Sequence, residues 1–236
     1  MKPVVLFALT LVSSLALAAG TLQDAQKQYA DGDFTGAATA AAALNTSDGF
    51  ALAAKANSIF ASTQPENKQE VLYSQSEKYA RSAVKLDDRN EDAYFEVARA
   101  LGRLSQLRGV LAALTQGLGG QIKENLDKAL KIDPQFASAL VALGLWHAEI
   151  VGKGVAFLYG ADPEKGIAAF NRAIKLEPNV IIHRVEFARG MMLIDGNKYK
   201  ADAIKQLEVA VTLSPRDAAE KLDLERAKRD LAALKK

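Results

Sequence analysis

The sequence predicts an all-α protein built as a solenoid of helix pairs, and three observations support that prediction. The phrase Ala-Leu-Lys-Ile-Asp-Pro at 129–134 returns as Ala-Ile-Lys-Leu-Glu-Pro at 173–178 and as Ala-Val-Thr-Leu-Ser-Pro at 210–215, with a weaker copy at 83–88. A phrase that recurs in this way indicates one supersecondary unit used several times. Each copy places alanine and an apolar residue on one helix face, and the proline then stops the helix. Alanine is abundant and only 7% of the residues are aromatic, which suits closely packed helices.

The N-terminus carries the pattern of a secretory signal peptide. Lys2 gives a positive start, residues 4–12 are apolar apart from one threonine, and Ala16-Leu17-Ala18 forms an Ala-x-Ala cleavage signature. The apolar stretch 4–19 is shorter than the ~20 residues that a membrane-spanning helix needs. This length favours a cleaved leader, with retention as a membrane anchor as the alternative.

We therefore expect residues 1–18 to be a signal peptide, cleaved after Ala18 or Ala19, and residues 19–236 to form one domain. The expected location is periplasmic or secreted. The chain contains no cysteine, so a covalent lipid anchor on cysteine is excluded. Disulfides are excluded for the same reason, although an oxidising compartment would allow them.

The repeated phrase recurs at intervals somewhat longer than the period of a known helix-pair repeat. From Asp88 the stops follow at intervals of 46, 44 and 37 residues, at Pro134, Pro178 and Pro215, whereas a tetratricopeptide repeat has a period of about 34 residues. The chain resembles the tetratricopeptide repeat family over about residues 22–215.

Individual residues carry this resemblance. Gly144 matches the small residue of the first repeat helix, Phe170 matches the large residue of the second, and Gly32-Asp33-Phe34 matches the turn between them. The resemblance implies about five antiparallel helix pairs followed by a C-terminal capping helix. The expected helices cover 22–31, 34–45, 48–62, 67–86, 91–107, 121–132, 136–151, 164–176, 180–195, 199–213 and 217–235.

A second resemblance begins near Gly120. The runs at 122–129, 143–146 and 158–160 resemble the regulator of microtubule dynamics family, and the likeness extends over 120–235. This resemblance implies a helix-pair architecture with insertions. It implies neither a partner nor an activity.

The surplus residues in the repeat intervals fall in two apolar inserts, at 109–122 and 150–162. The first contains no charged residue, and the second contains only Lys153 up to Gly160. Both occupy the same joint of consecutive repeats, so stacking is expected to bring them to one edge. They either fold back onto the core or form a pocket for a small apolar or lipid-like ligand, with weak membrane contact. The residues of that expected pocket are Leu111, Leu114, Leu118, Phe157 and Tyr159.

The resemblance to tetratricopeptide repeats also implies a concave face that binds a protein or peptide. The inner positions that carry over to this sequence as partner-binding residues are Phe95, Arg99, Val141, Leu145, Val185 and Arg189. The two arginines would suit a negative group on an extended peptide, because guanidinium is a planar fork of donors. The alternative is that they pair with Glu96 and Glu186 on their own helices.

The composition argues against several other classes of function. A formal net charge of +2 gives no basic excess for nucleic acid. The two histidines have no metal-binding spacing, and no nucleophile–base set can be named, so we expect no metal, no cofactor and no enzymatic activity. The sequence therefore predicts an exported protein-interaction or scaffold module, with a carrier or sensor of an apolar ligand as the alternative.

Overall fold

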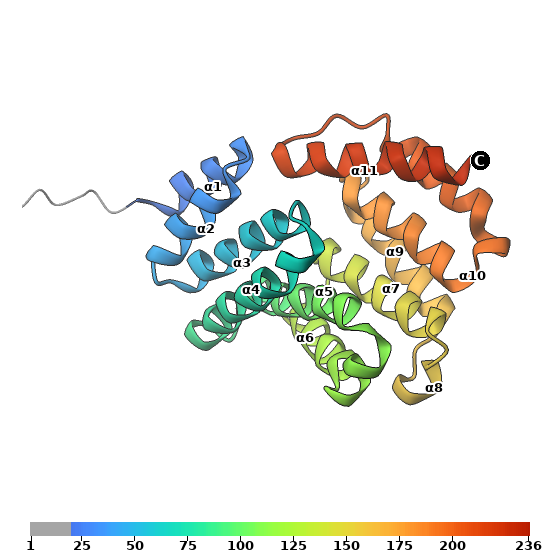
Figure 1. Ribbon diagram of the computed structural model, residues 1–236, viewed down its shortest axis with the longest axis horizontal. Helices are drawn as coiled ribbons and strands as arrows, with labels where there is room; N and C mark the ends of the chain where they lie inside the picture. The colour runs from blue at the N-terminus through green and yellow to red at the C-terminus, as the bar shows by residue number, and fades with distance from the viewer. Residues whose placement is uncertain (1–19) are drawn as a thin grey trace, which may run out of the picture.

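The computed structural model describes residues 20–236, and in this range the chain folds into eleven helices that curve around a common centre (Figure 1). The expected signal peptide falls outside the described residues. Within them, no helix has the length and apolar character needed to cross a bilayer. The helices are α1 (Leu22–Asp31), α2 (Phe34–Ala43), α3 (Ser47–Ser62), α4 (Glu66–Leu86), α5 (Glu91–Thr115), α6 (Leu118–Ile132), α7 (Ala137–Gly152), α8 (Ala156–Tyr159), α9 (Pro163–Leu176), α10 (Ile181–Ala210) and α11 (Ala218–Leu234).

Local sequence signals explain where several helices begin. Thr21 and Asp24 form a capping box at the start of α1, and the side chain of Asn90 accepts a hydrogen bond from the backbone of Ala93 at the start of α5. Asp162 caps α9, whose first residue is Pro163. Such caps satisfy backbone N–H groups that the first helical turn leaves free.

The helices pair as the repeat predicts. α1 packs on α2, α3 on α4, α5 on α6 and α7 on α9, while α10 supplies both members of the fifth pair. Extended backbone at Asp195 (φ −163°, ψ 96°) divides α10 into two arms. The helices expected at 180–195 and 199–213 therefore meet at this bend without a loop. The prediction of five antiparallel pairs and a final capping helix is confirmed.

The contact around Phe170 shows why the repeat needs small residues in its first helices. The ring of Phe170 is fully buried and stacks on Phe187 at 4.8 Å between centroids. A Cβ atom would come within 2.8 Å of this ring at Gly144 and within 2.6 Å at Gly190. The large residue of one helix thus fills the space that two glycines leave open.

The first insert differs from its expected form. We expected a helix to end at Leu107 and the next to begin at residue 121, but α5 continues to Thr115 and α6 begins at Leu118. The change of direction occurs at Gly109, with φ 78° and ψ 173°. Only glycine adopts this conformation readily, so the leucines and alanines on either side of it remain helical.

The two inserts meet at one edge of the molecule, as expected. In the second, α7 ends at Gly152 and the short helix α8 precedes α9. The indole of Trp146 donates a 2.8 Å hydrogen bond to the carbonyl of Gly119 in the first insert. The ring of Tyr159 covers the same glycine, where a Cβ atom would meet it at 2.9 Å.

The solenoid closes on itself. The start of α11 lies against α1 (Figure 1), where Ala219 packs in one buried cluster with Tyr29 and Phe34. The approach is close, because a Cβ atom at Gly32 would lie 3.0 Å from that of Ala218. The final helix therefore does more than cap the last pair, and its inner side faces the centre of a ring.

Candidate functional site

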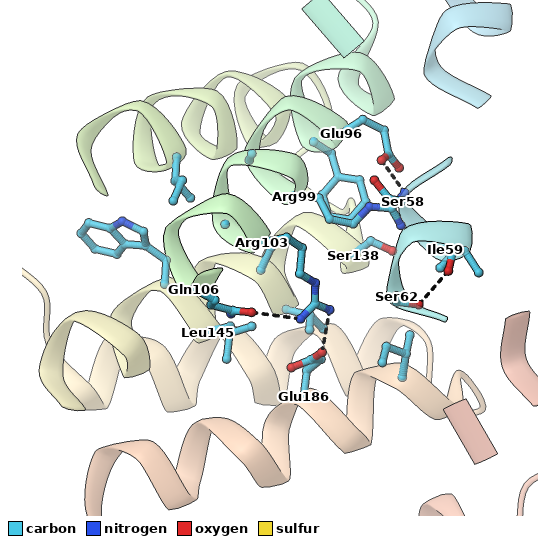
Figure 2. A pocket seen from close by; sticks show the side chains of 18 of the residues that line it. Ser58, Ile59, Ser62, Glu96, Arg99, Arg103, Gln106, Ser138, Leu145 and Glu186 are labelled. Carbon is cyan, nitrogen blue, oxygen red and sulfur yellow. Dashed lines mark hydrogen bonds and ion pairs between the residues drawn. The ribbon is translucent and has the colours of Figure 1, made fainter. Parts of the chain in front are cut away.

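The ring encloses a cavity of about 870 Å³ on its concave side (Figure 2). Side chains from both ends of the chain line it, since α1 and α11 contribute as well as α3, α5, α7 and α10. Cavities of about 300–1,000 Å³ are typical of sites for small ligands. A folded domain does not fit in this space, but a short extended segment does.

Most of the predicted concave residues lie in this cavity. Phe95, Arg99, Val141 and Leu145 line it. Val185 does not, because it is fully buried in the core of the last pairs. On α10 the side facing the cavity carries Ile182, His183 and Glu186, whereas the side chain at position 185 packs into the core.

Arg99 is held by a carboxylate on its own helix, as the alternative interpretation expected. Its Nη2 atom lies 2.5 Å from Oε2 of Glu96, a side chain that is 3% exposed. Burial raises the pKa of Glu96 to about 7, against the lowering effect of Arg99 and Lys55. The pair sits on the cavity wall formed by α3 and α5 (Figure 2).

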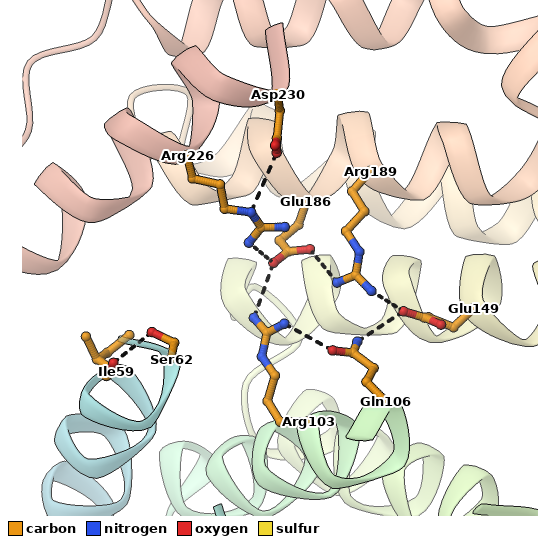
Figure 3. A network of polar contacts seen from close by, with 9 residues as sticks. All are labelled: Ile59, Ser62, Arg103, Gln106, Glu149, Glu186, Arg189, Arg226 and Asp230. Carbon is orange, nitrogen blue, oxygen red and sulfur yellow. Dashed lines mark hydrogen bonds and ion pairs between the residues drawn. The ribbon is translucent and has the colours of Figure 1, made fainter. Parts of the chain in front are cut away.

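The carboxylate of Glu186 is the centre of a network of arginines that crosses the concave face (Figure 3). Its Oε1 atom accepts hydrogen bonds from Arg226 of α11 at 2.9 Å and from Arg103 of α5 at 3.4 Å. Its Oε2 atom accepts one from Arg189 at 3.4 Å. Burial alone would raise the pKa of Glu186, but the three guanidinium groups outweigh it and lower that pKa to about 2.

The network continues to a fourth helix. Arg189 also pairs with Glu149 of α7, and Gln106 of α5 donates a 3.0 Å hydrogen bond to the same carboxylate. Arg226 lies 3.6 Å from Asp230. Three arginines and three carboxylates therefore join α5, α7, α10 and α11. In this arrangement Arg189 faces the network and does not line the cavity.

Two further titratable groups face the cavity. Burial lowers the pKa of His183 to about 4, which favours the neutral imidazole. Burial raises the pKa of Asp223 to about 7, against the effect of Arg226. Within residues 20–236, no group of three or more His, Asp or Glu side chains is arranged to hold a metal ion.

Sequence reasoning missed the contribution of α11. We expected residues 217–235 only as a helix that caps the last pair, and none of them as a binding residue. Leu231 and Leu234 do pack on that pair, but Leu222 lines the cavity together with Asp223 and Arg226. The charge pattern alone cannot distinguish a face toward bulk water from one toward an internal cavity.

The cavity extends between the two inserts. Leu114 and Tyr159 line this part. Leu118 is 3% exposed in the core, whereas Leu111 and Phe157 are 77% and 82% exposed. Both alternatives for the inserts therefore hold for some of their residues. Leu118 is part of the core, whereas Leu114 and Tyr159 line the cavity and Leu111 and Phe157 are exposed.

The fold is similar to that of solved tetratricopeptide repeat proteins. A thermophilic TPR protein of Thermus thermophilus, TTC0263, matches with a TM-score of 0.62 and 19% identity, over 88% of this chain and 97% of that one. Two structures of MamA match with TM-scores of 0.45 and 0.44 and identities of 18% and 17%. They cover 87% and 81% of this chain, and 96% and 88% of their own. The first of these matches shows a TPR-like fold.

A comparison with curated proteins found no match. The family model described as regulator of microtubule dynamics protein 1-3 matches residues 39–235. The match begins well before Gly120, where the sequence resemblance begins, and it includes the second helix pair, α3 and α4. This chain belongs to the regulator of microtubule dynamics protein 1-3 family.

Proposed function

We propose that this protein is an interaction module that holds an extended segment of a partner polypeptide inside its ring. The observation that carries the proposal is the closure of a TPR-like solenoid around one cavity of about 870 Å³. TPR-like solenoids present preformed concave surfaces to partners. Because the solenoid closes into a ring, only a narrow ligand can bind to its concave surface.

The chemistry of the cavity wall suits a polypeptide. Phe95, Leu145 and Trp146 provide apolar contacts, while Ser138 and Arg99 provide polar ones on the same wall. An extended segment presents side chains and backbone groups in alternation, and a wall of mixed character can contact both. The mechanism is passive binding to a surface that the helix packing has already formed.

Site-specific photo-crosslinking in the cells that make the protein tests this proposal. A photoreactive phenylalanine analogue replaces Phe95 in the cavity, and the matched control replaces Val71, which is 75% exposed and lies outside the cavity. We expect a covalent polypeptide adduct at position 95 and none at position 71. Adducts from position 71 alone would contradict the proposal.

A second candidate is a carrier or sensor of a small apolar or lipid-like molecule. The observation in its favour is that the cavity continues between the inserts, past Leu114 and Tyr159. Native mass spectrometry of the purified protein would then show a bound apolar molecule. Leu114→Asp is expected to remove that mass, while Leu111→Asp, at an exposed position outside the cavity, is expected to retain it.

Export is part of the proposal. It is supported by the charged start, the apolar run and the Ala-x-Ala signature of residues 1–18. N-terminal sequencing of the protein from an envelope fraction is expected to begin at residue 19 or 20. A mature chain that begins at Met1 would contradict cleavage and favour retention as an anchor.

A further inference from the structure

The ring closes at a small apolar seam between α1 and α11 (Figure 1). Ala219 of α11 packs in one cluster with the rings of Tyr29 and Phe34, and the neighbouring Ala218 meets Gly32. In the described part of the chain, the side-chain hydrogen bonds and ion pairs of α1 stay within that helix and its cap. The seam therefore depends on apolar burial, and a charge that forms beside it can shift the balance between a closed and an open ring.

Asp223 is a carboxyl group beside this seam. It lies one turn along α11 from Ala219, on the side that lines the cavity, and its side chain is half-buried. Within residues 20–236 its carboxyl group takes part in no hydrogen bond and no ion pair, whereas Glu220 on the same helix bonds Arg216. Ionisation would therefore place an unpaired charge where little water reaches it.

The charged groups that face Asp223 from α10 and from α11 itself are mostly carboxylates. Glu186 of α10, together with Glu220 and Asp217 of α11, disfavours its ionisation, whereas Arg226 favours it. Burial is the largest effect, and it raises the pKa of Asp223 from an ordinary 3.8 to about 7. The surroundings of Asp223 thus favour the neutral carboxyl group while the ring is closed.

Titratable groups on the other elements around the cavity are less able to act on the seam. On α1, burial raises the pKa of Tyr29, so its phenol stays neutral, and Lys55 of α3 lies 4.9 Å from the centre of that ring. Burial raises the pKa of Glu96 on α5 to about 7, but its partner Arg99 is on the same helix and stays with it when the seam opens. Burial lowers the pKa of His183 on α10 to about 4, so its imidazole is neutral above pH 6.

We propose that Asp223 is a pH-sensitive switch for closure of the ring: its neutral carboxyl group allows α1 and α11 to pack, and its carboxylate favours an open ring. On opening, the carboxylate gains the water that the closed ring excludes. An open ring also gives a polypeptide access to the concave face from the side. This consequence for binding rests on the proposed function, whereas the opening itself does not.

The direction of the pH effect follows from the raised pKa of Asp223. The closed ring binds this proton more tightly than the open ring, so closure is favoured at low pH and is opposed as pH rises toward 7. Full recovery of the ordinary pKa on opening would raise the ratio of open to closed molecules about tenfold per pH unit, levelling off above pH 7. The expected change between pH 6 and pH 8 is therefore about tenfold.

Spin labels across the seam test the switch. Lys27→Cys on α1 and Lys221→Cys on α11 place them at exposed positions, and the chain has no native cysteine. Electron spin resonance at pH 6 and pH 8 is expected to show an increase of about tenfold in the ratio of long to short distances. A ratio that falls as pH rises, or that stays equal while both populations are present, would overturn the proposal.

Carbon-13 NMR titration of the Asp223 carboxyl group covers the case in which one form of the ring dominates at both pH values. Coupling between protonation and closure is reciprocal, so opening the ring must lower the pKa of Asp223. Ala219→Gln enlarges a buried seam residue without adding a charge, and it is expected to lower that pKa by at least about one unit. The same titration midpoint in both proteins would overturn the proposal, as would an ordinary midpoint in the natural protein.

Three variants assign the effect to one residue. Asp223→Asn is expected to keep the ring closed at both pH values, since an asparagine side chain does not ionise. Glu225→Gln is the matched control on the same helix, because Glu225 is exposed and paired with Lys228, and pH-dependent opening is expected to remain. It is also expected to remain in Glu96→Gln. Opening that survives Asp223→Asn and disappears in Glu96→Gln would overturn the assignment.

These measurements contain no ligand, so they are independent of the proposed function. Photo-crosslinking at Phe95 decides separately whether the cavity receives a polypeptide. A ring that opens with rising pH but gives no adduct at position 95 would support the switch and contradict polypeptide binding.

Discussion

The carboxylate of Glu186 receives three guanidinium groups from three different helices. Arg103 comes from α5, Arg189 from α10 itself and Arg226 from α11. Glu186 is 4% exposed, and buried charges are tolerated only when they are paired and hydrogen-bonded. This one residue therefore holds the two halves of the ring in a fixed relation.

Glu186→Gln is predicted to destabilise the fold strongly. The substitution keeps the shape but leaves three arginines with less compensating charge, and removing one partner of a buried pair costs about 3–5 kcal/mol. Chemical denaturation monitored by circular dichroism measures the free energy of unfolding. The control is Glu225→Gln, whose exposed pair with Lys228 contributes little. Equal stability of the two variants would contradict the assigned role of Glu186.

Glu96 is predicted to make stability depend on pH in a definite direction. Its pKa is about 7 in the fold against an ordinary value of 4.5, so the folded state binds a proton more readily between these values. Unfolding free energy therefore falls as pH rises from about 4.5 to 7. His183, with a lowered pKa, acts in the opposite sense between pH 6.5 and 4.

The contribution of Glu96 to the pH dependence of stability is the difference between the natural protein and the Glu96→Gln variant. Unfolding free energies of the natural protein and of Glu96→Gln are compared at pH 5 and pH 7.5, which cancels the effect of His183. We expect a shallower decrease toward pH 7.5 in the variant. Parallel pH profiles would show that Glu96 keeps an ordinary pKa.

Residue-level reasoning succeeded where the determinants were close in sequence. The pairing of Arg99 with Glu96 was among the expected alternatives because three residues along a helix lie on one face. Val185 was misplaced on the concave face, since the choice of face depends on how α10 is rotated against α7 and α11. No short-range pattern specifies that rotation.

At the scale of helices, the repeated phrase marks the second member of each pair, and glycines mark where large side chains enter. Gly144 and Phe170 were matched to a repeat motif from sequence, and the structure shows the two in contact. The inserts were located correctly from the intervals between stops. Their internal form was not, because a break at Gly109 leaves the flanking residues helical.

Gly109→Ala is predicted to destabilise the protein by about 1–3 kcal/mol, because φ 78° with ψ 173° is strained for any residue with a Cβ atom. Gly102→Ala in the same helix is the matched control. A Cβ atom at Gly102 meets nothing within 4 Å, and alanine is expected to stabilise a helix interior by about 0.5–1 kcal/mol relative to glycine. Thermal unfolding is expected to give a lower midpoint for Gly109→Ala and a higher midpoint for Gly102→Ala than for the natural protein.

At the scale of the whole molecule, closure between α1 and α11 converts an open solenoid into a ring. The contact is small: Ala218 and Ala219 of α11 pack against Gly32 and the rings of Tyr29 and Phe34. The polar network reinforces it from inside through Arg226. Closure determines which ligands can reach the concave face.

Ala219→Asp is predicted to open the ring, because it buries a charge in the apolar contact with α1. The chain has no native cysteine, so spin labels can be placed at Lys27→Cys and Lys221→Cys without further changes. Electron spin resonance is expected to show a longer and broader distance distribution in the Asp variant. Ala233→Asp, at an exposed site on α11, is the control, and identical distributions in both would contradict closure through Ala219.

The all-α class, the helix pairs, the two inserts and the resemblance to tetratricopeptide repeats can be read from the sequence, because helix periodicity, caps and prolines act over short distances along the chain. The packing of the helices was needed to show that α11 returns to α1, that Asp223 and Arg226 face a cavity, and that Val185 is core. Those features depend on the accumulated rotation from one helix pair to the next. A small change in the rotation at each pair would move the two ends of the solenoid far apart, and no local pattern of residues specifies the total rotation.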